Sequence, residues 1–442
     1  MTRTKLLAVV LSVLPLVSAS LAAQGTEYYV SATRGKGKKA TKDQPAKDLG
    51  NIADMLKAGD TVHIAAGTYT GRSDNGRDLI TVPCKILGGW NDDFTARDPW
   101  GASQTIFSGD NKAKNFDGGI RLEIQVKDKK ATGDVVIDGI IVDNGARNQY
   151  AGGTVLKRMF TPKTGENASP DSPGIAVAAP APNTKVTVQN CIVLNCGPSG
   201  RRGAIEVKGF ENAQVTIRNN LIANNTSGIA CLCSFRPKSQ EGLPHFTVEN
   251  NTVLFTWKYD PIATHGGNAL VLEQTFCTAK GNIFAYGDYH GVNNQNGAKW
   301  QNLTLTDNTF TGNLQGDYLE FATKLGVGAF EDEAGCLTTG STGNTTAEVA
   351  AKVAETWSAS YAARNVIDRQ VAEADVTAKD TRANDLRRVL GLPLDGGSIA
   401  ATSEVWMHRF PLTDAVQIAQ QAQNGRGCSN PTTTAAAPAA PK

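Results

Sequence analysis

The sequence lacks an excess of charge of either sign. Its 442 residues include 44 Lys plus Arg and 42 Asp plus Glu, which gives a formal net charge of +2 at pH 7. Because the positive and negative charges nearly balance, the net charge does not indicate a polyanionic partner, and no nucleic-acid partner is expected. Charged residues make up only 19% of the chain, and 45 residues are glycine. This composition is typical of a turn-rich extracellular β protein rather than a cytosolic helical one.

Long apolar runs are also missing beyond the N-terminus. After residue 23 no stretch of about eighteen apolar residues occurs, so no transmembrane segment is predicted. Residues 1–23 differ, because Arg3 and Lys5 precede an apolar run from Leu6 to Val17 and small residues follow it. This is the pattern of a cleaved signal peptide, and it predicts a secreted or periplasmic protein.

Several familiar chemical motifs are absent. No glycine-rich nucleotide-binding loop, phosphate-binding loop or serine nucleophile elbow stands in a usable context. Cys231, Cys233 and Cys277 could be drawn as a metal site, but the nearest histidine, His245, has no second histidine at ligand spacing. The sequence therefore predicts no protein metal centre.

Eight cysteines remain in the mature chain. An even number in an exported protein favours disulfides, and Cys191–Cys196 and Cys336–Cys428 are the first pairs to expect. Stacked free thiols in a buried core would look the same in sequence, so this alternative stays open.

A short pattern does recur between residues 186 and 310. It reads VTVQNCIVLN from Val186, VTIRNNLIAN from Val215 and FTVENNTVLF from Phe246, with weaker copies from Cys277 and Leu303. The turn residue of each copy falls at Gly139, Asn190, Asn219, Asn250, Gly281 and Asp307. A spacing of roughly thirty residues with alternating β-branched residues is typical of a β-solenoid.

The residue types explain how such a coil would form. Val186 and Val188 alternate with polar residues, so one side of the strand faces a core and the other faces water. Asn tolerates the left-handed backbone of a sharp corner, and its amide can bond the equivalent Asn one coil away. A third strand begins at a small residue, as in GAIEV from Gly203 and GIACL from Gly228.

Three strands in each coil predict an all-β fold, a right-handed parallel β-helix. The alternative is a β-sandwich of hairpins, which would need turns of two to five residues between antiparallel strands. The Asn corners recur at the wrong interval for that arrangement.

The N-terminal region adds a resemblance. The order is YYVS, an amphipathic helix with Leu49, Ile52 and Leu56 on one face, then AGDTVHIAAGTY and ILGGWNDDF. Over residues 27–312 the chain resembles secreted right-handed β-helix proteins of the pectate-lyase-like superfamily. The resemblance implies that this helix covers the open first coil, which would otherwise expose unpaired strand edges.

The pattern divides the chain into four parts. Residues 1–23 are the signal peptide, and residues 24–312 are the β-helix with its N-terminal cap. Residues 313–430 have an Ala-rich helical periodicity and are predicted to form a C-terminal cap or appendage of helix and loop. Residues 431–442 are of low complexity and are predicted to be disordered.

The superfamily resembled includes polysaccharide lyases, hydrolases, epimerases and chains with no known activity. Its lyases use a Lys or Arg to remove the proton next to a uronic carboxylate, and calcium or another cation neutralises that carboxylate. Only charge stabilisation of the developing enolate makes this proton removable. A hydrolase would need a cluster of Asp carboxylates, and no such run stands on the Gly-led strands.

The Gly-led strands do supply a candidate patch. Ile205 and Val207 are expected to point inward, so Glu206 and Lys208 would point outward. The candidate catalytic residues are Lys208, Arg202, Glu206 and Glu273, with Lys208 or Arg202 as the base. The candidate substrate-binding residues are Arg201, His265, His290 and Asn293, with Asn294 beside them. The alternative is that these residues are simply the solvated side of a strand, which must be polar anyway.

The leading hypothesis is an exported β-helix protein that engages a polysaccharide or cell-surface glycan along one face, as a uronic-acid polysaccharide lyase if it is an enzyme. The alternative is a non-catalytic surface or matrix protein, whose rigid rod presents loops to a partner.

Overall fold

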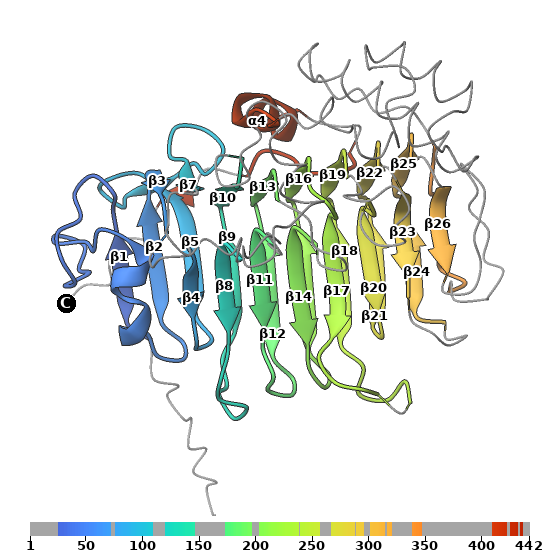
Figure 1. The fold of residues 1–442 in the computed structure, drawn as a ribbon, viewed down its shortest axis with the longest axis horizontal. Helices are drawn as coiled ribbons and strands as arrows, with labels where there is room; N and C mark the ends of the chain where they lie inside the picture. The colour runs from blue at the N-terminus through green and yellow to red at the C-terminus, as the bar shows by residue number, and fades with distance from the viewer. Residues whose placement is uncertain are drawn as a thin grey trace, which may run out of the picture.

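The computed structural model shows parallel strands stacked into a long solenoid (Figure 1). It describes residues 25–71, 76–108, 120–145, 173–196, 203–237, 239–256, 267–287, 289–295, 301–313, 316–320, 338–346, 409–421, 425–431 and 434–435. Each coil contributes one strand to each of three sheets, and equivalent strands of successive coils pair in parallel. The predicted right-handed parallel β-helix is confirmed, and the β-sandwich alternative is wrong.

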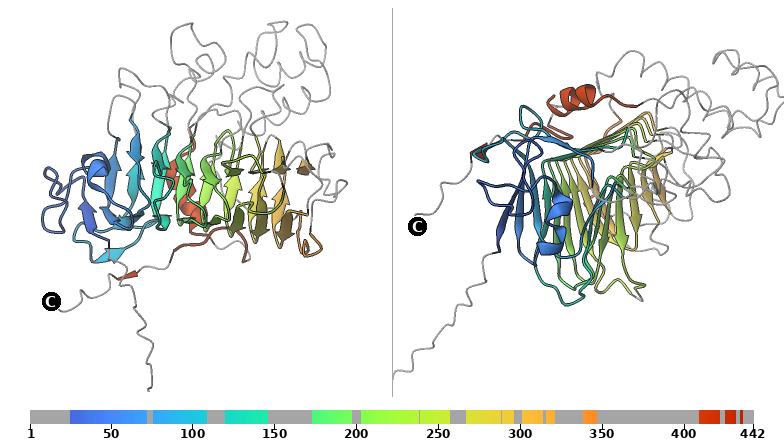
Figure 2. Two further views of the ribbon diagram at one scale, coloured as in Figure 1. Left: turned by 90° about the horizontal axis from the view of Figure 1, so that it is seen from below. Right: turned by 60° about the vertical axis from the view of Figure 1, so that its left-hand side comes forward.

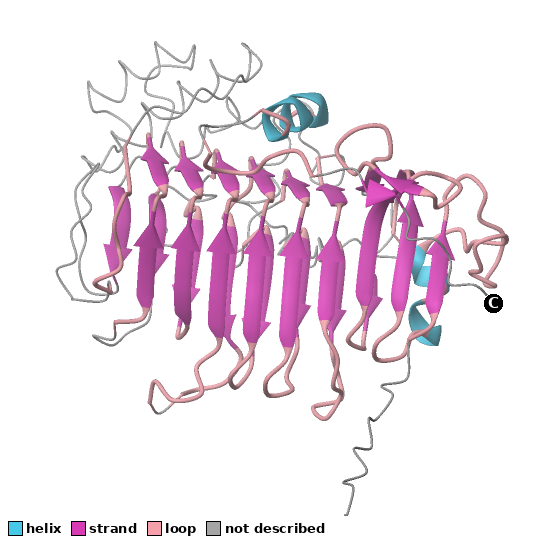
Figure 3. Cartoon of the chain, turned by 180° about the vertical axis from the view of Figure 1, so that it is seen from behind, coloured by secondary structure: helices cyan, strands magenta, loops and turns pink. Residues whose placement is uncertain are grey.

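The first sheet contains the strands before each Asn corner. Its parallel strands, in spatial order, are β1 (Glu27–Val30), β2 (Thr61–Ala65), β5 (Lys85–Trp90), β9 (Val135–Asp138), β12 (Lys185–Gln189), β15 (Gln214–Arg218), β18 (His245–Glu249), β21 (Phe276–Lys280) and β24 (Leu303–Thr306). Two short strands extend it: β6 (Ala96–Arg97) is antiparallel to β5, and β27 (Thr434–Ala435) is antiparallel to β6. Figure 3 shows the stack from behind.

The second sheet is narrow and follows the corner. Its strands are β3 (Gly67–Tyr69), β7 (Thr105–Phe107), β10 (Ile140–Asp143), β13 (Ile192–Leu194), β16 (Leu221–Ala223), β19 (Thr252–Leu254), β22 (Ile283–Ala285) and β25 (Thr309–Thr311).

The third sheet is made of the Gly-led strands. They are β4 (Asp78–Ile80), β8 (Leu122–Gln125), β11 (Ile175–Ala178), β14 (Ile205–Gly209), β17 (Ile229–Cys233), β20 (Leu270–Glu273), β23 (His290–Asn294) and β26 (Gly316–Glu320). Because β26 lies beyond residue 312, the solenoid continues past the boundary drawn from the sequence.

The corners form as the residue types predict. Asn190, Asn219, Asn250 and Asp307 have φ between 52° and 55°, and Gly139 and Gly281 stand in the same left-handed region. Asn219 Nδ2 donates to Asn190 Oδ1 at 2.7 Å, so amides of neighbouring coils do bond each other. The coil interior is filled by one continuous apolar cluster that draws on all three sheets.

The N-terminal end of the solenoid is covered by two 3₁₀ helices, η1 (Leu49–Asn51) and η2 (Ala53–Met55), rather than by an α-helix (Figure 2). Leu49, Ile52 and Leu56 are buried in the main core as the sequence predicts. Asp48 accepts from the Asn51 backbone N–H at 2.8 Å and caps the first turn. The prediction of one amphipathic helix is therefore wrong in type, although its apolar residues cover the coil.

The C-terminal segment packs on the outside of the second sheet. Helix α4 (Leu412–Ala419) buries Ala415, Ile418 and Ala419 against a second apolar cluster. That cluster includes Ile192, Leu194, Leu221, Leu254 and Ile283, which point outward from the narrow strands. Residues 409–421 and 425–431 thus pack on the solenoid, and the predicted Ala-rich helical stretch lies outside the described residues.

The predicted Cys191–Cys196 disulfide is wrong, since both cysteines are buried free thiols. They flank β13, whose three extended residues alone span roughly 10 Å, whereas a disulfide needs Cα atoms about 4.4–6.8 Å apart. Cys428 is also a buried free thiol, and its expected partner Cys336 lies outside the described residues.

Candidate functional site

The outer face of the third sheet holds part of the predicted patch. Ile205 and Val207 belong to the core, so Glu206 and Lys208 face outward from β14. Lys208 Nζ lies 3.1 Å from Glu206 Oε1, and the two side chains are 35% and 3% exposed. The predicted orientation of β14 is therefore confirmed, but the carboxylate is buried.

Glu273 shares a row with Lys208 without touching it. In the strand register, Lys208 aligns with Leu232 of β17, and Leu232 aligns with Glu273 of β20. Two strand spacings separate the residues by roughly 10 Å. The Cys233 thiol lies near Glu273, and its pKa is raised by burial and, to a smaller extent, by this carboxylate.

Strand β23 differs from the prediction. His290 and Asn294 alternate in step with Val292, a core residue, and both are buried. Asn294 Nδ2 donates to Tyr318 Oη at 3.2 Å inside the coil. The expectation that His290 and Asn294 lie on the outer face is therefore wrong, because a period of two places them with the core residue between them. Asn293 faces outward but is only 2% exposed.

The other predicted residues of this patch, Arg201, Arg202 and His265, lie outside the described residues. Their part in a site stays a prediction.

This face carries a third carboxylate, which was not among the predicted residues. Glu123 of β8 aligns with Ala176 of β11, which aligns with Glu206. Glu123 is 8% exposed and forms an ion pair with Arg77. The alternation in the sequence could have indicated Glu123, because it stands between the apolar residues Leu122 and Ile124. A charged residue flanked by core residues in a strand must face outward.

Long connections lead into this face. Residues 144–174 join β10 to β11, residues 195–204 join β13 to β14, and residues 255–269 join β19 to β20. Residues 224–228, which join β16 to β17, make a shorter connection. Segments that connect the strands of a rigid scaffold are where binding residues commonly stand.

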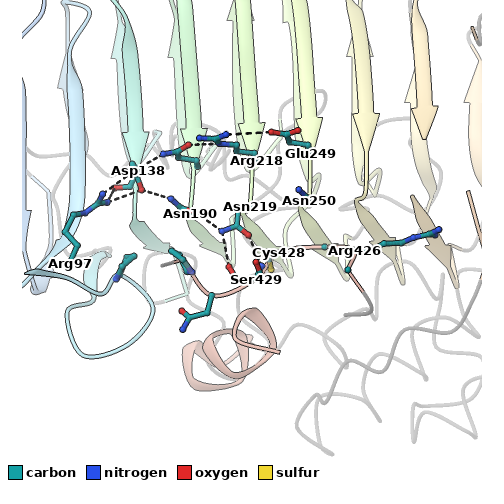
Figure 4. Close-up of a pocket in the computed structure, with 16 residues that line it drawn as sticks. Arg97, Asp138, Asn190, Arg218, Asn219, Glu249, Asn250, Arg426, Cys428 and Ser429 are labelled. Carbon is teal, nitrogen blue, oxygen red and sulfur yellow. Dashed lines mark hydrogen bonds and ion pairs between the residues drawn. The ribbon is translucent and has the colours of Figure 1, made fainter. Parts of the chain in front are cut away.

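A groove of about 610 Å³ runs along the Asn corner between the first and second sheets, and we call it the corner groove (Figure 4). One wall is the outward row at the ends of first-sheet strands, and the other is the C-terminal segment. Its lining residues are Arg97, Pro99, Asp138, Gln189, Asn190, Arg218, Asn219, Glu249, Asn250 and residues 425–431. Nothing in the repeat pattern pointed to it.

At one end of the corner groove, Asp138 is fully engaged. Arg97 Nη2 and Nη1 donate to its carboxylate at 3.0 and 3.3 Å. Gln189 Nε2 and Asn190 Nδ2 donate to the same carboxylate at 2.8 and 2.9 Å. This end is therefore a closed polar network that fixes the wall.

The C-terminal wall is bonded to one coil after another. Gly427 donates its backbone N–H to Gly281 O at 2.7 Å, and Cys428 donates to Thr252 Oγ1 at 2.9 Å. Ser429 N donates to Asn219 Oδ1 at 2.7 Å, and Asn219 Nδ2 returns a bond to Ser429 O at 3.0 Å. Residues 427–429 thus bind three successive coils.

Among the described residues, no group of three or more His, Cys, Asp or Glu side chains is placed to hold a metal ion. A calcium requirement stays a prediction. Within the same residues, no helix is long and apolar enough to cross a bilayer.

No protein-family model and no curated protein sequence matches this chain. Among solved structures it is similar to a GH136 lacto-N-biosidase from Eubacterium ramulus, with 13% identity and a TM-score of 0.36. The match covers 68% of this chain and 52% of that chain, so this chain spans about half the length of that enzyme. The fold is therefore assigned from the three parallel sheets themselves.

Proposed function

We propose that this protein is exported and binds a polysaccharide or cell-surface glycan along the outer face of the third sheet. The observation that carries the proposal is the Glu206–Lys208 pair on that face, 3.1 Å apart, with the carboxylate buried and the lysine side chain 35% exposed. Burying the Glu206 carboxylate costs free energy, so this ion pair is a weak stabilising device and leaves a partly exposed cation on the outer face.

The chemistry of the pair suits sugar hydroxyls. An ammonium donates up to three hydrogen bonds, so Lys208 can donate to a sugar hydroxyl while it stays paired with Glu206. Glu123 with Arg77 repeats the arrangement two strands away, roughly 10 Å along the solenoid axis. An extended polymer lying along the axis would meet both pairs, whereas a compact ligand would meet one.

A lyase reaction is the second candidate, with Lys208 as the base. Its side chain is 35% exposed, so Nζ can meet a substrate. To act as a base, however, the Lys208 ammonium must first give up a proton and leave Glu206, because only the neutral amine has a lone pair for the substrate's proton. Binding needs no such step, so glycan binding is our first proposal and catalysis the second. A non-catalytic matrix role would use the same face without turnover.

The binding test compares Lys208→Ala with Lys185→Ala, which removes an exposed lysine from the first sheet. Affinity pulldown on pectate, alginate and glycosaminoglycan matrices should show weaker retention of Lys208→Ala and unchanged retention of Lys185→Ala. The expected loss is about tenfold, as for one hydrogen-bonded charge. Equal retention of the two variants and the wild type would refute the third-sheet site.

Turnover is tested on the same polysaccharides by the absorbance of the unsaturated uronic product, with and without calcium. Product that disappears in Lys208→Ala would support the lyase. Retention without any product would establish binding without lyase chemistry.

A further inference from the structure

The corner groove contains a cluster of hydrogen-bonding groups that the closed network around Asp138 does not use. Arg218 Nε donates to Gln189 Oε1 at 2.7 Å, which holds the guanidinium against the wall. Its side chain is nevertheless 50% exposed. The Nη groups therefore face solvent from a fixed position.

Glu249 lies beside this guanidinium but does not form a hydrogen bond with it. Arg218 Nη1 and Glu249 Oε1 are 3.9 Å apart, and the two side chains are 50% and 32% exposed. That separation exceeds a hydrogen bond, so the donor and the acceptor both keep bonding capacity. A hydroxyl between them can accept from Arg218 and donate to Glu249 at the same time.

Asn250 supplies the third group. It is the next corner residue after Asn190 and Asn219, with φ 53°. The amides of Asn190 and Asn219 are used by Asp138, by each other and by Ser429. The exposed Asn250 side chain makes no hydrogen bond within the described part of the chain. Its amide can donate to one hydroxyl and accept from another.

The charges of the groove indicate what kind of ligand fits. Arg97 is neutralised by Asp138. Arg426 keeps its positive charge, but it donates to the carbonyl oxygens of Asn308 and Gly343 at 3.0 and 2.9 Å, so the fold uses its N–H groups. The remaining pair, Arg218 and Glu249, has no net charge. An anionic ligand would gain little from Arg218 because Glu249 stands next to it.

We infer that the corner groove is a binding site for a neutral saccharide, which Arg218, Glu249 and Asn250 recognise through adjacent hydroxyl groups. Its volume of about 610 Å³ is within the usual range for small-molecule sites. The inference does not rest on the third-sheet proposal, since the two sites share no residue. The groove needs residues 425–431 as its second wall, so it exists only when the C-terminal segment is docked.

The test measures binding of neutral hexasaccharides of cellulose, xylan, mannan and β-1,3-glucan, with hexagalacturonate as the charged comparison. Isothermal titration calorimetry on the full mature chain would report affinity for the wild type, Arg218→Gln and Glu249→Gln. Lys185→Gln, an exposed lysine on the same sheet, is the matched control. Thermal unfolding of each variant checks that it is folded.

At least one neutral hexasaccharide should bind, and both groove variants should lose about tenfold or more in affinity while Lys185→Gln loses none. Lys208→Ala should bind this ligand as the wild type does, which separates a failure here from a failure of the third-sheet site. Three results would overturn the inference: no neutral ligand bound at millimolar concentration, unchanged affinity in both groove variants, or binding of hexagalacturonate that is tighter than that of every neutral ligand and is weakened by Arg218→Gln.

Discussion

At the scale of single residues, His63 of β2 shows how burial sets the chemistry of a side chain. Its ring stacks on Tyr29 with centroids 4.9 Å apart and meets the edge of Trp90 at 5.1 Å. Burial lowers the pKa of His63 from 6.5, and Glu27, 3.8 Å away, opposes the shift. Arg97 and Lys42 lower it further.

This shift predicts a loss of stability in mild acid. Because the folded pKa lies below the unfolded value of about 6.5, the unfolded chain binds a proton first as the pH falls. The stabilising contribution is complete above pH 6.5 and is lost as the pH falls toward the folded pKa. Urea unfolding at a series of pH values gives the free energy of unfolding of the wild type and of His63→Phe, which keeps an aromatic ring. Between pH 6.5 and the folded pKa this free energy should decline less steeply in the variant than in the wild type. Parallel pH profiles for the variant and the wild type would contradict this account.

At the scale of elements, the corners are joined by an internal ladder of amides, one residue after the corner residues. Asn220 N–H and Nδ2 donate to Asn251 Oδ1 at 3.1 and 2.9 Å. Asn251 in turn donates to Asn282 Oδ1 at 3.0 Å and to Ile217 O at 2.8 Å. The same pattern continues through Asn308 and Asn344. Each amide therefore satisfies backbone groups that the turn leaves without strand partners.

Removing one amide from this ladder should lower the stability of the fold. Asn251→Ala leaves the buried Asn220 N–H and Ile217 C=O without this partner, at about 1–3 kcal/mol for each group. Chemical denaturation should therefore show a free energy of unfolding lower by about 2–5 kcal/mol. The control is Asn250→Gly, since Asn250 is exposed and glycine adopts its positive φ without strain. Similar losses in the two variants would show that the ladder has no special role.

At the scale of the whole molecule, the three faces of the solenoid differ. The first sheet presents a row of in-register threonines, Thr187, Thr216, Thr247 and Thr278, which are partly or fully exposed. The second sheet is covered by α4 and the C-terminal segment, as Figures 1 and 2 show. The third sheet carries two ion pairs whose carboxylates are buried and whose cations are partly exposed. A single repeat thus produces three different surfaces.

The covering of the second sheet predicts the effect of truncation. A chain that ends before Arg409 would expose Ile192, Leu194, Leu221 and other apolar residues of the narrow strands. It should unfold at a lower temperature and bind a hydrophobic dye, because each such side chain gains about 1.5–3 kcal/mol from burial. A chain that ends at Ala435, after β27, is the control and should resemble the wild type. Equal unfolding temperatures would mean that the segment does not stabilise the rod.

The sequence by itself determined the coil. Alternating β-branched residues fix which side of a strand is buried, and Asn or Gly at Asn190, Asn219 and Gly281 fixes the corners, because both effects act over a few neighbouring residues. The same local rules placed Glu206 and Lys208 on the outer face.

Only the tertiary structure decided the rest. The corner groove joins Arg97, Arg218 and Glu249 to residues 425–431, and no local pattern reports contacts between segments so far apart in the chain. The structure also decided whether Cys191 and Cys196 form a disulfide and whether His290 points inward. Both depend on where each strand starts and ends within its coil. Alternation reveals that two faces exist, whereas the position of a strand in the folded coil decides which residue occupies which face.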